Sequence, residues 1–298
     1  MDWDLTRCTL CPLACGADRS RGAGRCGGGS LPRVALADIH RGEEPPIVGS
    51  RGSGAVFFSG CNMGCLFCQN YQISARGIGR EVSVERLAEI FLELQGRGVH
   101  NLNLVSAGHF LPWVAEALRL AKAQGLCLPV VWNTNSYERV EALRQLEGLV
   151  DIYLPDLKYW DDGLARAYSA APGYFETAAA AILEMRRQVG ADVLDEDGVM
   201  RRGMIVRHLV LPGCRQDSRR VLDWVRANLG PEVRVSLLWQ YTPLYRAAEV
   251  KALNRRVTSF EYEDVVDYFF AIGLHNGYRQ GKEAATAAWT PDFDLRGV

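Results

Sequence analysis

The nine cysteines of this chain have the spacing that most clearly indicates chemistry. Three of them, Cys61, Cys65 and Cys68, fall within eight consecutive positions, so their thiolates can reach one soft metal centre. A tetrahedral zinc ion needs a fourth protein ligand, whereas a 4Fe–4S cluster held by three cysteines keeps one iron open for an outside ligand. The spacing therefore allows either a zinc knuckle or an iron–sulfur cluster with chemical reactivity.

A second set of four cysteines lies near the N-terminus, at Cys8, Cys11, Cys15 and Cys26. The surrounding segment is rich in glycine and has little apolar material, so a bound metal is expected to fold it. Structural zinc is the first interpretation, an auxiliary iron–sulfur cluster is the second, and four free thiols are the remaining alternative. The isolated Cys127 and Cys214 are expected to be small buried hydrophobic residues.

Alternating strands and helices are expected to position these residues. Strand patterns occupy 55–58, 101–105, 129–132, 151–154, 205–211 and 234–239. Helix patterns occupy 83–95, 112–124, 137–146, 176–188, 218–229 and 261–272, with Ser83 and Ser218 as expected N-caps. Such alternation predicts an α/β fold with a parallel sheet covered by helices.

Six such units are fewer than the eight of a closed barrel. We therefore expect a partial (β/α)6 TIM-like barrel with an N-terminal Cys-rich metal-binding extension; a doubly wound sheet is the alternative. Residues 1–54 are expected to form the extension, with an irregular linker over residues 31–54. Residues 55–298 are expected to form the barrel and a C-terminal tail.

Polar residues follow the predicted strands at their C-terminal ends, where active sites of such sheets lie. They are the cysteine loop, Gly108 and His109, Asn133 to Asn135, Asp156 with Lys158, and Gln240 with Tyr241. Arg207 and His208 are neighbours on one strand, so one should face the interior and the other the helices. These side chains form the predicted site.

Composition restricts the class of partner. The net charge of the 298-residue chain is −1, which gives no support for a nucleic-acid partner. No apolar run approaches the roughly 20 residues that span a bilayer, so no membrane partner is expected. The acidic start lacks the features of a signal peptide, and cytoplasmic localisation is expected.

The motif Cys-x3-Cys-x2-Cys, with Phe67 before its third cysteine and at the end of the first strand, resembles that of the radical S-adenosylmethionine (SAM) superfamily. The resemblance implies that Cys61, Cys65 and Cys68 hold a 4Fe–4S cluster and that SAM chelates its fourth iron. It also implies that Phe67 lies near the adenine.

A narrower similarity is to the pyruvate formate-lyase activating enzymes, in particular their PflX-type branch, over about residues 55–245. It rests on Asn133-Thr134-Asn135-Ser136, Leu154-Pro155-Asp156-Leu157-Lys158, the segment from Arg207 to Gly213, and the N-terminal CxxCP pattern. Two positions depart from the family. Ala107-Gly108-His109 stands where the superfamily has Gly-Gly-Glu, and Asn133 stands where activating enzymes have aspartate.

The resemblance implies reductive cleavage of SAM to a 5′-deoxyadenosyl radical, which abstracts hydrogen from a protein or peptide substrate. A small metabolite is the alternative substrate, and a non-catalytic iron–sulfur electron carrier is the alternative of another class. A flavodoxin- or ferredoxin-type reductant is implied. Lys158 and His109 are the expected catalytic residues, and the expected cofactor-binding residues are Phe67, Gly108, Asn133, Thr134, Asn135, Asp156 and Arg207.

Overall fold

A mostly parallel sheet runs through the protein in the computed structural model, which describes residues 4–286 and 290–298. Its parallel strands lie side by side in the order β2 (Ser53–Phe58), β4 (Leu102–Val105), β5 (Val130–Thr134), β6 (Ile152–Pro155), β8 (Met200–Leu209), β9 (Arg234–Leu238) and β10 (Gly277–Arg279). Antiparallel strands extend it: β1 (Arg33–His40) beside β2, β3 (Arg80–Glu81) beside β1, and β7 (Val193–Leu194) beside β8.

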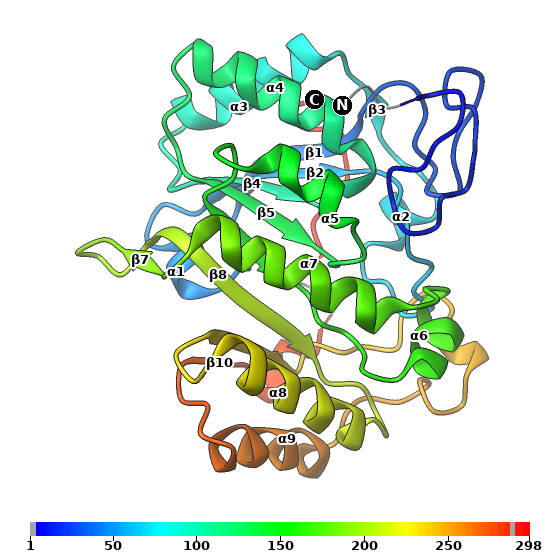
Figure 1. The fold of residues 1–298 in the computed structure, drawn as a ribbon, viewed down its shortest axis with the longest axis vertical. Helices are drawn as coiled ribbons and strands as arrows, with labels where there is room; N and C mark the ends of the chain where they lie inside the picture. Colours follow the sequence, from blue (N-terminus) through cyan, green and yellow to red (C-terminus); the bar gives the residue numbers. More distant parts are fainter. Residues whose placement is uncertain (1–3, 287–289) are drawn as a thin grey trace.

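Helices connect the strands and cover the outer face of the sheet (Figure 1). The longer ones are α3 (Val84–Gly96), α4 (Leu111–Ala123), α6 (Asp162–Ser169), α7 (Tyr174–Val189), α8 (Arg215–Leu229) and α9 (Ser259–Ala271). Short helical turns are α1 (Pro45–Val48), α2 (Tyr71–Ser74), α5 (Val140–Leu143), η1 (Gly108–Phe110), η2 (Arg144–Leu146), η3 (Ala247–Glu249) and η4 (Lys282–Ala284). The molecule is thus an α/β protein whose parallel sheet is consistent with a partial barrel.

All six predicted strands and all six predicted helices are confirmed within a few residues. The Ser83 N-cap is also confirmed, because its side chain accepts a hydrogen bond from the backbone N–H of Arg86. The Ser218 cap is wrong: α8 begins at Arg215, and Ser218 lies inside it, hydrogen-bonded to His208. The expected burial of Cys127 is wrong as well, since this residue is exposed.

The expected irregular linker over residues 31–54 is wrong in two places. Residues 33–40 form strand β1, whose apolar side chains are buried against β2. Residues 45–48 form α1, which places Ile47 in the interior of the sheet against Val131, Ile152 and Leu154. The segment from 41 to 52 therefore closes one end of the barrel interior and leaves the other end for the site.

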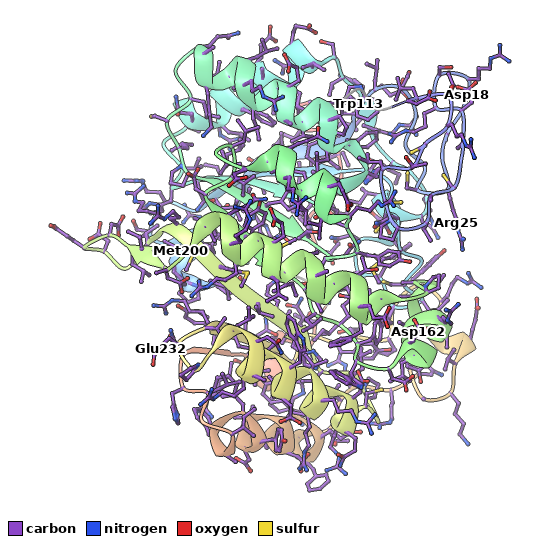
Figure 2. The ribbon with its side chains drawn as sticks, in the orientation of Figure 1. Asp18, Arg25, Trp113, Asp162, Met200 and Glu232 are labelled. Atoms are coloured by element: carbon purple, nitrogen blue, oxygen red, sulfur yellow. The ribbon has the colours of Figure 1, made fainter. Side chains whose placement is uncertain are left out.

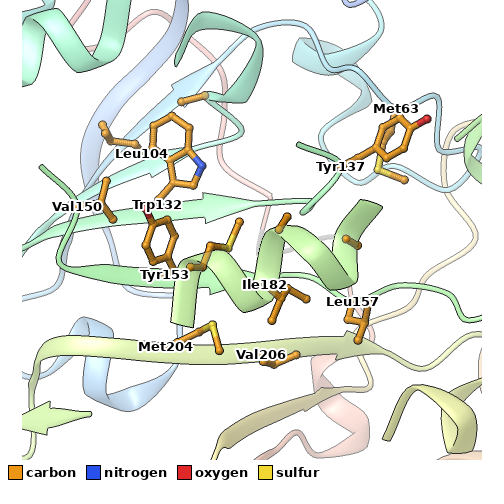
Figure 3. Close-up of a cluster of buried hydrophobic side chains, with 14 of the residues drawn as sticks. Met63, Leu104, Trp132, Tyr137, Val150, Tyr153, Leu157, Ile182, Met204 and Val206 are labelled. Atoms are coloured by element: carbon orange, nitrogen blue, oxygen red, sulfur yellow. The ribbon is translucent and has the colours of Figure 1, made fainter. Parts of the chain in front are cut away.

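The larger core lies between the sheet and the helices (Figure 3). Trp132 of β5, Tyr153 of β6 and Met204 of β8 belong to this core together with Ile182 of α7. All four side chains are fully buried, and residues of this size dominate core energetics. This core fixes the directions of the strands and so the positions of the polar residues at their ends.

In the described part of the chain, no helix is long and apolar enough to cross a membrane.

Candidate functional site

A cavity of about 240 Å³ opens at the C-terminal ends of the parallel strands. The parallel strands β2, β4, β5, β6, β8 and β9 each contribute to its wall directly or through the loop that follows, because parallel strands end at one edge. The predicted residues in the wall are Cys61, Cys65, Phe67, Cys68, Asn133, Thr134, Asn135, Asp156, Lys158, Arg207, Gln240 and Tyr241. The structure therefore brings most of the predicted site together.

The three cysteines that follow β2 have the surroundings of metal ligands. Burial raises the pKa of Cys61 to about 12 and that of Cys68 to about 11, and the neighbouring thiols add to both shifts. A hydrogen-bond donor stands beside each sulfur: Asn135 Nδ2 is 3.4 Å from Cys61 Sγ, Ser169 Oγ is 3.0 Å from Cys65 Sγ, and Ser74 Oγ is 3.2 Å from Cys68 Sγ. Such donors stabilise the thiolate forms that bind a metal.

The number of ligands also matters. Among residues 4–286 and 290–298, no three His, Cys, Asp or Glu side chains are gathered closely enough to hold a metal ion. A zinc ion would need a fourth protein ligand beside the three cysteines, whereas a 4Fe–4S cluster can be held by three cysteines with one iron left open.

A buried network of charges forms the floor of the cavity. Arg207 is 3.0 Å from Glu43 Oε2 and 3.1 Å from Asp156 Oδ1, and Lys158 Nζ is 2.6 Å from Asp156 Oδ2. Burial acts to raise the pKa of Asp156, but the charges of Lys158 and Arg207 outweigh it and hold that pKa below its ordinary value. The carboxylate is therefore ionised, and the whole network is polar and rigid at neutral pH.

Glu43 is a functional candidate that the sequence analysis missed. Its Oε1 accepts hydrogen bonds from Asn103 Nδ2 at 3.1 Å and Asn133 Nδ2 at 3.0 Å, and it lines the cavity. It reaches this place because the segment before α1 enters the barrel interior. The one sequence signal was a pair of acidic residues, Glu43 and Glu44, immediately before two prolines.

The neighbours Arg207 and His208 face opposite sides of β8, which confirms their predicted alternation. Arg207 also donates a hydrogen bond to Asn133 Oδ1 and faces the cavity. His208 is bonded to the carbonyl of Leu157 and to Ser218 of α8, and burial lowers its pKa to about 4. His208 is therefore a neutral structural residue of the helix layer.

Gly108 and His109 lie outside the wall of the main cavity. They line a small hollow behind it, together with Ser106, Thr134 and Glu138. His109 Nε2 is 2.8 Å from the carbonyl oxygen of Ser59, and burial lowers its pKa to about 4. The structure gives His109 a contact with the loop before Cys61, and its catalytic role stays a prediction.

Glu138 brings a carboxyl group to this hollow from the loop after β5. Its oxygens accept hydrogen bonds from Trp132 Nε1 at 3.2 and 3.1 Å, and a Cβ added at Gly108 would stand 2.1 Å from Oε1. Burial raises the pKa of Glu138 to about 7. The chain thus places an acidic group beside Gly108, at the turn where the superfamily pattern has its glutamate one residue later.

We expect Glu138→Gln to remove a pH-dependent loss of stability. Because the folded state holds the proton up to about pH 7 and the unfolded chain releases it near 4.5, rising pH destabilises the wild type across this window. Relative to the variant, the loss is up to roughly 1.4 kcal/mol per pH unit. Urea unfolding across the window measures it. Glu263→Gln, at an exposed position of α9, is the control. A difference between Glu138→Gln and wild type that does not change with pH contradicts the prediction.

The four N-terminal cysteines gather in one coil segment. A Cβ added at Gly24 would lie 3.5 Å from Cys26 Sγ and 3.7 Å from Cys15 Sγ. Burial raises the pKa of Cys11 to about 11, and the charges of Cys26, Cys8 and Cys15 act in the same direction, so all four thiols are neighbours. The structure therefore brings this predicted set of cysteines together.

Three comparisons relate this fold to known proteins. The model of the radical SAM superfamily matches residues 55–196, a little less than half of the chain, so this part of the chain is similar to that superfamily. An uncharacterised protein of Methanocaldococcus jannaschii is 30% identical over 240 residues, which cover 77% of this chain and 64% of the relative. The matched region therefore spans less than two thirds of that relative.

Solved structures share the fold at low sequence identity. The FeFe-hydrogenase maturase HydG from Carboxydothermus hydrogenoformans is 12% identical with a TM-score of 0.52, covering 75% of this chain and 52% of HydG. SuiB of Streptococcus suis is 14% identical with a TM-score of 0.51, covering 77% of this chain and 49% of SuiB. A domain of a pyruvate formate-lyase activating enzyme from Bacteroides vulgatus is 12% identical with a TM-score of 0.43, covering 58% of this chain and 92% of that domain.

Proposed function

We propose that this chain is a radical SAM enzyme that holds a 4Fe–4S cluster at Cys61, Cys65 and Cys68 and binds SAM in the adjoining cavity. One observation carries the proposal. In the region that is similar to the radical SAM superfamily, three half-buried cysteines, and no fourth among the described residues, line one polar cavity at the strand ends. An arrangement with three protein ligands leaves one iron to bind an outside ligand.

When bound, the cluster supplies the one electron that cleaves SAM into methionine and a 5′-deoxyadenosyl radical. The residues of the chain bind and orient the reactants and exclude water. Asp156, Lys158 and Arg207 present fixed charges for the amino and carboxylate groups of SAM, and Asn133, Thr134 and Asn135 supply hydrogen bonds. Phe67, whose ring centre is 5.5 Å from that of Tyr241, offers an aromatic surface for the adenine.

For the substrate we propose a protein or peptide, as in the activating enzymes that the chain resembles, and specifically the PflX-type branch. The support is the set of strand-end motifs around Asn133, Asp156 and Arg207, which the structure places on one cavity. Lys158, which lines the cavity, is the proposed catalytic residue that faces the substrate. A catalytic role is also proposed for His109, which lies in the small hollow behind the cavity wall. A small metabolite is the alternative substrate. It would be distinguished from a protein substrate by transfer of a hydrogen atom from the metabolite itself to the nucleoside.

The proposal includes a flavodoxin- or ferredoxin-type reductant and a cytoplasmic location. All nine cysteines are free in the structure, including the four near the N-terminus. Free thiols in this number suit a reducing compartment, where one-electron protein reductants are also found. An iron–sulfur carrier without catalysis remains the competing class, and three cluster cysteines in place of four speak against it.

Formation of 5′-deoxyadenosine tests the proposal. Air-free protein reconstituted with iron and sulfide, then mixed with dithionite and SAM, should release this nucleoside. Cys65→Ala should reduce the yield to background, whereas Cys127→Ala, at an exposed position far along the chain, should match the wild type. A fully loaded wild type that yields no nucleoside contradicts the enzyme and favours the carrier. Deuterium passing from a labelled protein partner into the nucleoside identifies a macromolecular substrate.

A further inference from the structure

The N-terminal segment is built around its four cysteines. Residues 4–32 contain neither helix nor strand, and backbone hydrogen bonds within the segment join Cys8 N–H to the carbonyl of Ala17 and Gly16 N–H to the carbonyl of Cys8. Cys8 and Cys26 are buried, and Cys15 is exposed. The segment thus places its sulfurs between the body of the protein and the solvent.

A buried arginine fixes this segment to the body. The guanidinium of Arg19 lies 5.3 Å from the ring centre of Phe110 and 4.7 Å from that of Trp113, and it donates hydrogen bonds to the carbonyls of Gly29 at 3.0 Å and His109 at 2.8 Å. Arg19 is only 2% exposed. Figure 2 shows Trp113 close to the segment, whose outer loops carry Asp18 and Arg25. The position of the four cysteines relative to the barrel is therefore rigid.

The two cysteine sets are joined by one hydrogen bond. The backbone N–H of Cys61 donates to the carbonyl oxygen of Cys26 at 2.9 Å. Gly60 makes the approach possible: its φ is +88°, and a Cβ there would lie 2.3 Å from the same carbonyl oxygen. Cys26 and Cys61 are thus connected by one hydrogen bond between their backbones, and in each residue only a few covalent bonds separate the backbone from the sulfur.

We propose that Cys8, Cys11, Cys15 and Cys26 hold a second, fully ligated iron–sulfur cluster that exchanges electrons with the site at Cys61. Its role as a donor rests on the proposed function; its existence does not. Four thiolates fill every ligand position of such a cluster, which suits electron transfer and leaves no iron open. The contact between Cys26 and Cys61 favours a cluster over the zinc ion that was the first interpretation, because zinc has no redox chemistry and cannot pass an electron.

The position of the N-terminal cysteines also suits the transfer of one electron from the surface to the site at Cys61. One electron enters from a flavodoxin- or ferredoxin-type reductant on the exposed side, near Cys15, and leaves toward Cys61 on the buried side. The N-terminal centre is reduced once and re-oxidised once for each electron, with no bond made or broken. This device separates the surface that meets the reductant from the cavity that must exclude water.

Iron analysis of two complementary variants of the full chain tests the proposal. In the first, Cys61→Ala, Cys65→Ala and Cys68→Ala are combined, which leaves the N-terminal segment intact. We expect this variant to retain about four irons per chain and no zinc, and dithionite to give it an EPR signal that SAM does not change. In the second, Cys11→Ser and Cys15→Ser are combined, and we expect about four irons whose EPR signal SAM does change.

The wild type and the Cys127→Ser control should each bind about eight irons. Their reduced EPR spectrum should show broadening from magnetic interaction that is absent from the summed spectra of the two variants. Zinc, or no metal, in the first variant overturns the second cluster. If the first variant holds its iron but the signal of the second ignores SAM, the proposed function fails instead. Circular dichroism of both variants detects loss of folding, and the first variant decides the proposal even where the second does not fold.

Discussion

Arg207→Met is expected to lower the free energy of unfolding by about 3–5 kcal/mol, the usual result of stranding buried charges without their partner. Arg207 is bonded to Glu43, Asp156 and Asn133, and only Lys158 stays beside the acidic groups when it is removed. Methionine keeps much of the side-chain volume of arginine, so the lost free energy of unfolding measures the effect of removing the charge. Urea unfolding of the variant against wild type measures it.

The same variant should recover part of its stability in acid. Without Arg207, less positive charge opposes the burial that raises the pKa of Asp156, so this carboxyl group takes up a proton more readily in the folded state and the deficit shrinks as pH falls. Adding Glu43→Gln should also recover part of the loss. Arg187→Met is the control, because Arg187 is half-exposed in its pairs with Glu147 and Glu184 and should cost no more than about 1 kcal/mol. If Arg207→Met and Arg187→Met lower the free energy of unfolding equally, the charge network around Arg207 has no special role in stability.

The sequence predicted the elements with strong local patterns. Helix α3 has Ser83 before it and Leu87, Phe91 and Leu94 on one face, and both features recur in the structure. Strand β1 was missed although its apolar residues are buried, because the neighbouring prolines and glycines resemble those of a linker. Ser218 was misplaced as a cap because α8 begins three residues earlier, at Arg215. Its hydroxyl is bonded instead to His208 of strand β8.

The site was predictable where the strand-end rule applied and not where the fold brings in distant residues. Cys61, Asn135 and Asp156 follow parallel strands and meet at one edge as expected. Glu43 reaches the cavity only because the segment before α1 enters the barrel, and no local pattern encodes that path. His109 lies in the hollow behind the cavity and contacts the carbonyl oxygen of Ser59, a partner from a different strand end that no local pattern indicates.

Gly60→Ala should disrupt both cysteine sets from a single position. An alanine there must leave a φ of +88° or bring its Cβ to 2.3 Å from the Cys26 carbonyl oxygen and 3.0 Å from His109 Nε2. Backbone strain of this kind costs on the order of 1–3 kcal/mol, and the clash with main-chain oxygen adds to it. We therefore expect the loop to shift, the hydrogen bond from Cys61 to Cys26 to break, and iron at the barrel cysteines to fall by more than half.

Gly64→Ala is the matched control for this prediction. It lies in the same loop, has no positive φ, and its added Cβ would meet Ala170 Cβ at 3.3 Å, a contact that a small shift relieves. Iron content, EPR line shape and unfolding free energy of the two variants separate the effects. If Gly60→Ala keeps the iron content and the magnetic interaction of the wild type, the contact between Cys26 and Cys61 is incidental. If both properties are lost together while Gly64→Ala keeps them, one glycine couples the N-terminal segment to the cavity because only its backbone permits the two cysteines to meet.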